Sequence, residues 1–425
     1  MYAPLAHLSL EEQRSYQSRS LEKLLGYLHA YSPYYKKLFL AYKIAWEKIK
    51  TLEDLVHIPT TDKNTLQNNN WDFLCVAKNE IREYTATSGT LGKPVTLALN
   101  ANDLKRLAYN EEQSFLCTGA AKEDIYQLML TLDRQFMAGM AYYSGLGNIG
   151  ASVIRTGPGL PAMQWETIAR LQTTGIVAVP GFIIKLIEYA KANAISLNDS
   201  PVKKAVCIGD NLRNENFELN ALGSRIRADW NMELYNTYAS TEMQTAFTEC
   251  RYGKGGHEQA ELILTEILDE AGNQLNDGEY GEVTITTLGV EGMPLLRYRT
   301  GDVACMYSEP CRCGRFSRRI SPVKGRKQQM IKYKGTTLYP PALFDTLNSV
   351  SFINEYAVEV KKDELGSDEL TIFIEAQNAD MEFLKNFLQS CIRVTPQIIN
   401  ISAQQMQQLL FPQSSRKPQR FIDNR

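Results

Sequence analysis

The stretch IVAVPGFIIKLIEYAKANAISLNDSPVKKAVCIG, residues 176–209, indicates the fold class of this chain. An apolar run at 176–180 is followed by a helical pattern over about 181–194 and by a second apolar run at 204–208. Short apolar strands that alternate with helices are typical of an α/β fold, in which the strands pair mostly in parallel. Two further segments continue the alternation, a strand at 125–132 and a helix at 161–174.

Glycines follow two of these predicted strands, at Gly181 and Gly209. Open α/β sheets bind ligands beyond the carboxyl ends of their strands, so the turn at Gly209 and Asp210 is a candidate ligand contact. An ordinary turn between a strand and a helix explains the same residues, and on their own we favour that explanation.

The two ends of the chain differ from this middle part. SLEE at 9–12 is typical of a capping box, and the leucine spacing after it predicts a helix to Tyr31. A basic segment rich in turn-forming residues at 318–327 indicates a domain boundary. Beyond it we expect strands and a helix at 356–360, 370–374, 381–392 and 398–401. The chain is therefore predicted to form a large multi-layer α/β domain over 1–325 and a small α+β domain over 326–425.

The composition favours a globular protein with small-molecule ligands. The 425 residues are 44% hydrophobic and 22% charged, and 46 basic and 48 acidic side chains leave a net charge of −2. This balance points to neither nucleic acid nor a membrane as a partner. The amino terminus lacks a signal-peptide pattern, and the longest apolar run, 176–189, is too short to cross a bilayer. Eight cysteines are too sparse for a disulfide framework, so we expect a cytoplasmic protein.

The stretch TATSGTLGKP at 85–94 combines hydroxyls, two glycines and a lysine. Glycines let backbone N–H groups approach an anion, hydroxyls add donors, and lysine adds a positive charge, which together suit phosphate binding. The spacing is not that of a Walker P-loop, in which four residues separate the glycines. Taken alone, the stretch is equally well explained by a hairpin turn before a strand at 95–99.

Two acidic segments suit other parts of a nucleotide. Glu242, in YASTE at 238–242, follows an apolar run, and Mg²⁺ prefers one or two carboxylates together with phosphate oxygens. Asp302 ends RYRTGD at 297–302, where a predicted turn would present it as an acceptor for two ribose hydroxyls. Taken singly, each segment is more simply a turn that carries a solvated acid.

In their order along the chain, these segments resemble the signatures of the acyl-adenylate-forming superfamily of ligases and synthetases. TATSGTLGKP is similar to its Gly-rich signature, with Leu91 in place of a threonine, and YASTE is similar to its Tyr-Gly-x-Thr-Glu motif, with Ala239 in place of glycine. YRTGD matches a further motif, and the segment 325–335 resembles the hinge motif. The segments YSPYY, IPTTDK and KPQRFID are similar to the phenylacetate–coenzyme A ligase branch, so the resemblance spans nearly the whole chain.

This resemblance implies a two-step reaction with ATP, Mg²⁺ and coenzyme A. A carboxylate attacks the α-phosphate of ATP to give an acyl-AMP and pyrophosphate, and the thiolate of coenzyme A then displaces AMP. The β- and γ-phosphates would be held by Thr87, Ser88, Gly89, Thr90 and Lys93. Glu242 would hold Mg²⁺, Thr241 would contact the α-phosphate, and Lys417 would stabilise charge from the small domain. A homodimer is also implied.

The remaining implied roles concern the nucleoside, the hinge and the acyl group. Gly209, Asp210 and Tyr238 would line the adenine slot. Asp302 would accept the ribose hydroxyls, with Arg326 beside them. Gln328 occupies the position about which the small domain rotates between the two half-reactions, and Phe136 falls in the region that forms the aryl pocket.

A second set of residues is independent of ATP. Cys250, His257, Cys311 and Cys313 supply three thiolates and an imidazole, which complete a tetrahedral zinc site, and nearby glycines allow tight loops. The alternative is two chance cysteine turns and a surface histidine, and we favour zinc. Such a site has no open position, so the zinc would be structural. Members of the phenylacetate branch carry a similar pattern.

We therefore predict an ATP-dependent aryl or arylacetic acid–coenzyme A ligase, with phenylacetate as the nominal substrate. One alternative is a synthetase that passes the acyl group to an amine, a hydroxyl or a carrier-protein thiol. The other is a catalytically silent nucleotide-binding scaffold. If AMP release depends on coenzyme A, the chain is a ligase and not a synthetase with another acceptor. If the chain catalyses pyrophosphate exchange, it is not a silent scaffold.

Overall fold

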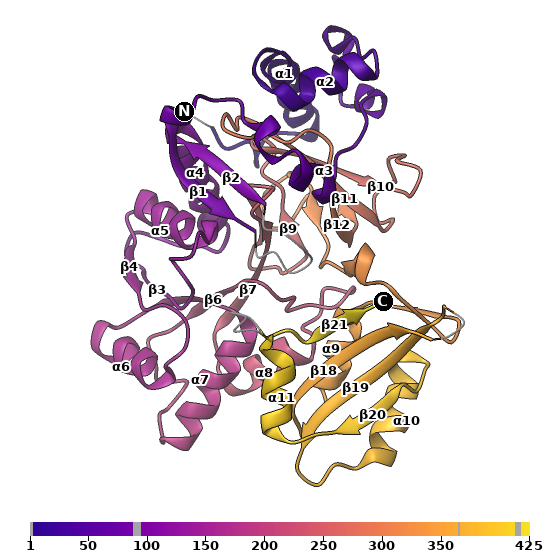
Figure 1. The fold of residues 1–425 in the computed structure, drawn as a ribbon. Coiled ribbons are helices and arrows are strands. Elements are labelled where there is room, and N and C mark those ends of the chain that lie inside the picture. Colours follow the sequence, from indigo (N-terminus) through magenta and orange to yellow (C-terminus); the bar gives the residue numbers. More distant parts are fainter. Residues whose placement is uncertain (1–2, 88–94, 364–365, 413–417) are drawn as a thin grey trace. The chain divides into compact units, whose positions relative to one another are not determined.

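A computed structural model describes residues 3–87, 95–363, 366–412 and 418–425 (Figure 1). The chain divides into two compact units. The first consists of Met1–Glu218 and Arg225–Val323, and the second consists of Leu219–Ser224 and Lys324–Arg425. Within the described ranges, no helix has the length and apolar character needed to cross a membrane.

Among the described residues, the largest sheet of the first unit has nine strands in the order β13-β14-β9-β8-β7-β6-β5-β3-β4. The run from β7 to β4 pairs in parallel, which confirms the predicted α/β fold class. The parallel strands are β3 (Ile125–Leu128), β4 (Ser152–Arg155), β5 (Gly175–Ala178), β6 (Lys204–Cys207) and β7 (Glu233–Ser240). The helices between them are α5 (Met137–Ile149), α6 (Pro161–Leu171), α7 (Pro180–Ala192) and α8 (Ala221–Asp229).

The start of α7 differs from the sequence-based expectation. β5 ends at Ala178, and Pro180 begins the helix, where a proline is favoured because its missing N–H has no partner to lose. Gly181 therefore lies inside the helix and not at a turn after the strand. Every position of β5 is buried, as expected for a parallel strand that is covered on both faces.

The other end of the large sheet is antiparallel. Its strands are β8 (Thr245–Glu249), β9 (Gly256–His257), β14 (Arg319–Ile320) and β13 (Met306–Tyr307). A further antiparallel sheet of the first unit contains β10 (Ile263–Leu268), β11 (Gly281–Thr287) and β12 (Tyr298–Ala304).

The prediction that 297–302 forms a turn is wrong. Most of this segment lies in β12, where Arg299 pairs in register with Thr284 of β11. The Arg299 guanidinium also donates to the Glu282 carboxylate of β11 at 2.8 Å, and Tyr298 is buried. Cross-strand pairs of opposite charge and a buried aromatic residue favour the extended conformation.

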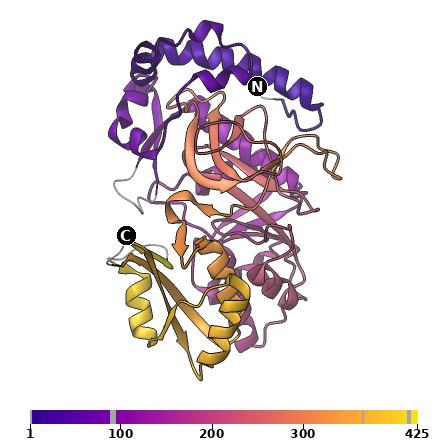
Figure 2. The ribbon, with the colours of Figure 1, turned by 90° about the vertical axis from the view of Figure 1, so that its right-hand side faces the viewer.

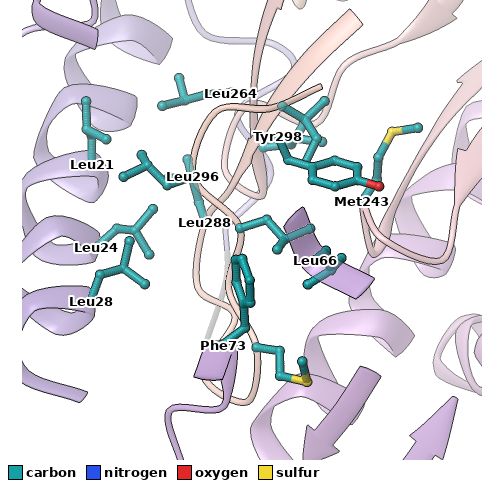
Figure 3. Close-up of a cluster of buried hydrophobic side chains, with 14 of the residues drawn as sticks. Leu21, Leu24, Leu28, Leu66, Phe73, Met243, Leu264, Leu288, Leu296 and Tyr298 are labelled. Carbon is teal, nitrogen blue, oxygen red and sulfur yellow. The ribbon is translucent and has the colours of Figure 1, made fainter. Parts of the chain in front are cut away.

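The N-terminal helices pack against this second sheet. They are α1 (Leu10–Tyr31), α2 (Pro33–Ala41) and α3 (Lys63–Asn68). The predicted capping box at the start of α1 is confirmed, since Ser9 and Glu12 each bind the other's backbone N–H. Figure 2 shows the helices beside the strands, and Figure 3 shows leucines of α1, such as Leu24 and Leu28, directed toward Leu288 and Leu296. The hairpin β1 (Ile81–Ala86) and β2 (Thr96–Asn100) and the helix α4 (Ala101–Cys117) follow.

The second unit is a small α+β structure. Its longest strands, β18 (Ile353–Lys362) and β19 (Asp368–Ala376), pair antiparallel, and β20 (Gln397–Asn400) and β21 (Phe421–Asn424) flank them in parallel. The other elements are β15 (Gly325–Arg326), β16 (Ile331–Tyr333), β17 (Thr336–Leu338), α9 (Pro340–Asn348), α10 (Met381–Ile392) and α11 (Ala403–Leu410). Helix α10 has the predicted bounds because Leu384, Leu388 and Ile392 give it one buried face.

Candidate functional site

Several predicted ligand contacts lie at the carboxyl ends of the parallel strands. Gly209 and Asp210 follow β6 and are exposed, and Thr241 and Glu242 follow β7 directly. Because β6 and β7 are parallel neighbours, their carboxyl ends meet at one edge of the sheet (Figure 1). This edge is where open α/β sheets bind their ligands.

A hydrogen bond joins two predicted nucleotide contacts from different sheets. The Tyr238 hydroxyl of β7 donates to the Asp302 carboxylate of β12 at 2.8 Å. Asp302 is buried, and its backbone N–H donates to the Thr300 hydroxyl at 3.1 Å. The structure thus brings together the residues that sequence reasoning assigned separately to the adenine and to the ribose.

Sequence reasoning missed Asn236, which lines a small cavity together with Tyr238, Asn211 and Pro322. Asn236 is buried, and its Oδ1 lacks a hydrogen-bond partner among the residues that the structure describes. Most buried side-chain polar atoms in folded proteins have a hydrogen-bond partner, so an unpaired amide oxygen is uncommon. The available signal was spacing, since residues two apart on a strand share a face.

The turn between β7 and β8 carries the predicted phosphate and Mg²⁺ residues. Glu242 is only 9% exposed, and within the described ranges its carboxylate accepts no hydrogen bond. Arg106 of α4 is fully buried and fixes the end of this turn. Its guanidinium donates to the Gln244 carbonyl at 2.6 Å and to the Thr245 hydroxyl at 2.9 Å. The same guanidinium reaches the Leu262 and Leu288 carbonyls at 2.6 and 2.7 Å.

Thr87 and Phe136 lie on segments that are joined by the backbone. Thr87 closes the β1–β2 hairpin, because its N–H donates to the Val95 carbonyl at 3.0 Å and its hydroxyl accepts from the Val95 N–H at 3.1 Å. One residue earlier, the Ala86 N–H donates to the Gln135 carbonyl at 3.0 Å. Phe136 follows Gln135, is half-buried, and packs against a buried cluster that includes Tyr142.

Other predicted residues cannot be placed in this site. Ser88, Gly89, Thr90, Lys93 and Lys417 lie outside the described residues. Arg326 and Gln328 belong to the second unit, and both side chains are exposed. The Gln328 carbonyl accepts from the Arg425 guanidinium at 2.9 Å within that unit.

The predicted zinc ligands come together. The ligand atoms of Cys250, His257, Cys311 and Cys313 all lie within 4.8 Å of one another. The Cys250 and Cys311 sulfurs are 3.6 Å apart, and the Cys313 sulfur is 3.6 Å from His257 Nε2. His257 Nδ1 contacts the Ser317 hydroxyl at 3.2 Å, which directs Nε2 toward the sulfurs as metal-bound histidines require.

The loops around this cluster explain how distant residues meet. Gly253 follows Cys250 and Gly314 follows Cys313, both with positive φ, and each of their N–H groups closes a tight turn onto a cysteine carbonyl. Burial opposes ionisation of the Cys313 thiol, but the contacts with His257 and Arg315 outweigh it and lower its pKa to about 5. A thiolate is the form that binds metal.

A grouping of polar residues at the carboxyl edge of an α/β sheet is typical of proteins that bind a nucleotide there. The AMP-binding enzyme family matches residues 66–292, which is more than half of the 425 residues. The chain belongs to this family.

Within the family, the chain is similar to phenylacetate–coenzyme A ligases. The ligase of Thermus thermophilus is 28% identical over 374 residues, which cover 85% of this chain and 82% of that protein. The ligase of Escherichia coli K12 is 25% identical over 365 residues, which cover 84% and 82%. Among solved structures, a 2-hydroxyisobutyryl-CoA ligase in the postadenylation state matches with a TM-score of 0.86 at 19% identity, over 99% of this chain and 91% of that one.

Proposed function

We propose that this chain activates an aryl or arylacetic carboxylate, nominally phenylacetate, as an acyl-AMP and then transfers the acyl group to coenzyme A. The observation that carries the proposal is the grouping at the carboxyl edge of the parallel strands, where Tyr238 and Asp302 meet beside the turn that holds Glu242. The relatives named as phenylacetate–coenzyme A ligases support the choice of substrate class.

In the first step, a carboxylate oxygen bonds to the α-phosphorus and the bond from that phosphorus to the bridging oxygen breaks, releasing pyrophosphate. This displacement on a crowded anion depends on positioning and on neutralisation of charge. Thr87, Ser88, Gly89, Thr90 and Lys93 are proposed to hold the leaving phosphates, and Thr241 to contact the α-phosphate. Glu242 is the proposed ligand of Mg²⁺, which when bound reduces the negative charge of the phosphates.

The nucleoside is proposed to bind along Gly209, Asp210 and Tyr238, with Asp302 accepting the ribose hydroxyls and Arg326 beside them. Asn236 adds a role that the sequence did not indicate. Asn236 lines the cavity next to Tyr238, and its amide suits the exocyclic amino group of adenine, which is a hydrogen-bond donor.

In the second step, the thiolate of coenzyme A bonds to the acyl carbon and the bond to AMP breaks. By the family resemblance, the domain at 326–425 moves about Gln328 between the two steps, and Lys417 stabilises charge during adenylation. Phe136 is the proposed wall of the acyl pocket, in keeping with its half-buried position. A cytoplasmic location and a homodimer belong to the same proposal.

Carboxylate-dependent ATP–pyrophosphate exchange tests the proposal with a panel of aryl, arylacetic and fatty acids. We expect exchange with aryl or arylacetic acids and, when coenzyme A is added, stoichiometric release of AMP. If no acid supports exchange and Lys417→Ala changes nothing, the chain is a silent scaffold. If exchange occurs but coenzyme A does not accelerate AMP release, the acceptor is an amine, a hydroxyl or a carrier-protein thiol.

The cysteine and histidine cluster is proposed to bind a structural Zn²⁺. Three sulfurs and one imidazole nitrogen match a preferred zinc ligand set, and their mutual distances suit ligands around one ion. A zinc ion held there would cross-link β9 to the loops at Cys250 and Cys311, next to the strand that begins at the phosphate turn.

A further inference from the structure

The guanidinium of Arg425, just after β21, is the centre of a hydrogen-bond network within the second unit. Its Nε and one terminal nitrogen donate to the two Asp423 carboxylate oxygens at 2.8 and 2.6 Å. That terminal nitrogen also donates to the Gln328 carbonyl at 2.9 Å. The other terminal nitrogen donates to the Met330 carbonyl at 2.7 Å and to the Asp368 carboxylate at 3.3 Å. Each N–H donor of the guanidinium therefore has an acceptor.

Two of these acceptors belong to the backbone of the proposed hinge. Gln328 lies in a short 3-10 helix, Lys327–Gln329, and Met330 follows it. When a hinge rotates, a few residues change their φ and ψ angles, and the carbonyls of those residues turn. A guanidinium is planar and rigid, so by binding the carbonyls at 328 and 330 together it restricts the dihedral angles between them. A rotation within this segment must break at least one of the two hydrogen bonds.

The same guanidinium is anchored to the main sheet of the second unit. Asp423 belongs to β21, which pairs in parallel with β18, where Val360 lies opposite Asp423 (Figure 1). Asp368 begins β19, and its side chain is only 2% exposed. Arg425 thus joins the hinge carbonyls to two strands of one sheet.

Strand β21 also follows the lysine that is proposed to act in adenylation. Its first residue, Phe421, comes four positions after Lys417 in the sequence. Four residues span at most roughly 14 Å, so the position of β21 limits where Lys417 can reach. We propose that Arg425 is a positioning residue for adenylation, which clasps the hinge segment 327–330 to this strand, so that the hinge angle and the reach of Lys417 are set together. This inference rests on the proposed adenylation activity.

The network also shows which variants can test the clasp. Lysine carries the same charge as arginine, but its ammonium lacks the planar fork that binds two carbonyls and a carboxylate pair together. Asp368 does not depend on Arg425 alone, because it accepts from the Lys332 N–H at 2.7 Å and from the Lys362 ammonium at 2.6 Å. Loss of the Arg425 side chain therefore leaves this buried carboxylate paired, and we expect the second unit to stay folded.

The kinetic test measures the two half-reactions separately in Arg425→Met and Arg425→Lys. ATP–pyrophosphate exchange reports adenylation, and thioester formation from coenzyme A and pre-formed phenylacetyl-AMP reports the second step. Arg425→Met should lower kcat of exchange by about 10- to 100-fold and change KM for ATP by less than about 3-fold, because the lysine is misplaced while no substrate contact is removed. Thioester formation should change by less than about 3-fold, since Lys417 is proposed to act in adenylation. Arg425→Lys should behave as Arg425→Met does.

Leu388→Ala is the control for a general loss of stability in the same unit. Leu388 lies in the buried face of α10, so its truncation should lower the melting temperature and change both half-reactions by the same factor. Hydrogen–deuterium exchange of the ligand-free protein then tests the clasp without any activity. In Arg425→Met, the amides of 325–333 should exchange at least about 10-fold faster than in wild type.

Three results overturn the inference. The first is wild-type hydrogen–deuterium exchange of 325–333 in Arg425→Met, and the second is an equal fall of both half-reactions, as in Leu388→Ala. The third is full recovery of pyrophosphate exchange in Arg425→Lys. If wild type supports pyrophosphate exchange with no acid, the proposed function fails and the positioning role fails with it, even where hydrogen–deuterium exchange still shows the clasp.

Discussion

The two ends of strand β8 are built differently. Before its first residue, the turn at 241–244 leaves the Glu242 carboxylate and the Gln244 amide without partners among the described residues. At its last residue, the Glu249 carboxylate accepts two bonds from the Arg213 guanidinium at 3.0 and 3.1 Å, and Cys250 enters the four-residue cluster. At one end of this strand a buried carboxylate is paired within the described chain, and at the other end the carboxylate that is proposed to bind Mg²⁺ is not.

Removal of one ligand from the cysteine and histidine cluster should disrupt the end of β8 at Cys250 and cause the largest loss of stability. Cys311→Ser takes away one of three thiolates, so we expect loss of bound zinc and a decrease of more than about 4 kcal/mol in the free energy of unfolding. Metal analysis and thermal unfolding measure the two quantities. Cys117→Ser is the matched control, because Cys117 is buried against the cluster but is not one of its ligands. A metal-free wild type that melts at the same temperature as Cys311→Ser would rule out a metal centre.

A substitution at the unpaired end should affect activity and spare stability. Glu242→Gln removes the proposed Mg²⁺ ligand but no hydrogen bond within the described chain, so we expect pyrophosphate exchange to fall by about 10²- to 10³-fold. Unfolding in urea should change by less than about 1 kcal/mol. Asp124→Asn is the control, because the Asp124 carboxylate is bound to Thr174 at 2.8 Å and Lys204 at 3.1 Å before β3. Asp124→Asn should lose stability and keep activity. The comparison is contradicted if Glu242→Gln loses stability and keeps activity, while Asp124→Asn loses activity and keeps stability.

The smallest expected effect is a pH dependence of stability, and it involves a carboxyl group that is linked to the middle of β8. The Ala246 N–H donates to Asn110 Oδ1, and Asn110 Nδ2 donates to the Glu111 carboxylate at 2.8 Å. Burial raises the pKa of Glu111 to about 8, although hydrogen bonds from Asn110 and Ser114 oppose the shift. Burial also raises the pKa of Tyr142, and the negative charge of Glu111 adds to that shift.

The sign of the resulting pH dependence follows from linkage. Below pH 4.5, the ordinary pKa that applies to the unfolded chain, Glu111 is protonated in both states and its contribution to stability is fully present. As pH rises toward about 8, the unfolded chain ionises while the folded protein holds the proton, so this stability is lost. Glu111→Gln should therefore gain on the order of 1 kcal/mol relative to wild type between pH 6 and pH 8. Unfolding of both proteins in urea at pH 6 and pH 8 checks this prediction. If wild type and Glu111→Gln lose the same free energy of unfolding between the two pH values, the prediction is wrong.

The sequence predicts elements whose signal is local. The leucines of α1 and the buried face of α10 are periodic, so their helices were predicted with correct ends. The strands β9, β13 and β14 have two residues each and hold no pattern to detect. The sequence predicts Pro180 as the end of a strand, but it begins α7. The first N–H of a helix has no acceptor within the helix, so a proline, which lacks this N–H, is favoured there.

In the candidate site too, some residues have a signal in the sequence and others do not. Cys250, His257, Cys311 and Cys313 can be identified as a set because few residue types bind zinc. The lack of a partner for the buried amides of Asn236 and Gln244 in the described chain could not be predicted. That property depends on packing with residues that are distant in sequence, such as Arg106 at 138 positions from Gln244. Spacing places Asn236 on the same strand face as Tyr238, but it does not show which of its atoms lack a partner.

The packing of α1 has a consequence for the synthesis of the chain. Its buried leucines are covered by residues near Leu288 and Leu296, and Tyr27 donates to a carbonyl that lies 264 residues later. At about 5–20 residues per second, a ribosome needs roughly 10 to 50 s to supply that partner. For this time, an apolar helix face of the nascent chain has no native surface to cover it. The native packing of α1 therefore cannot be completed before translation supplies this partner, and a chaperone that binds amphipathic helices has a defined period in which to act.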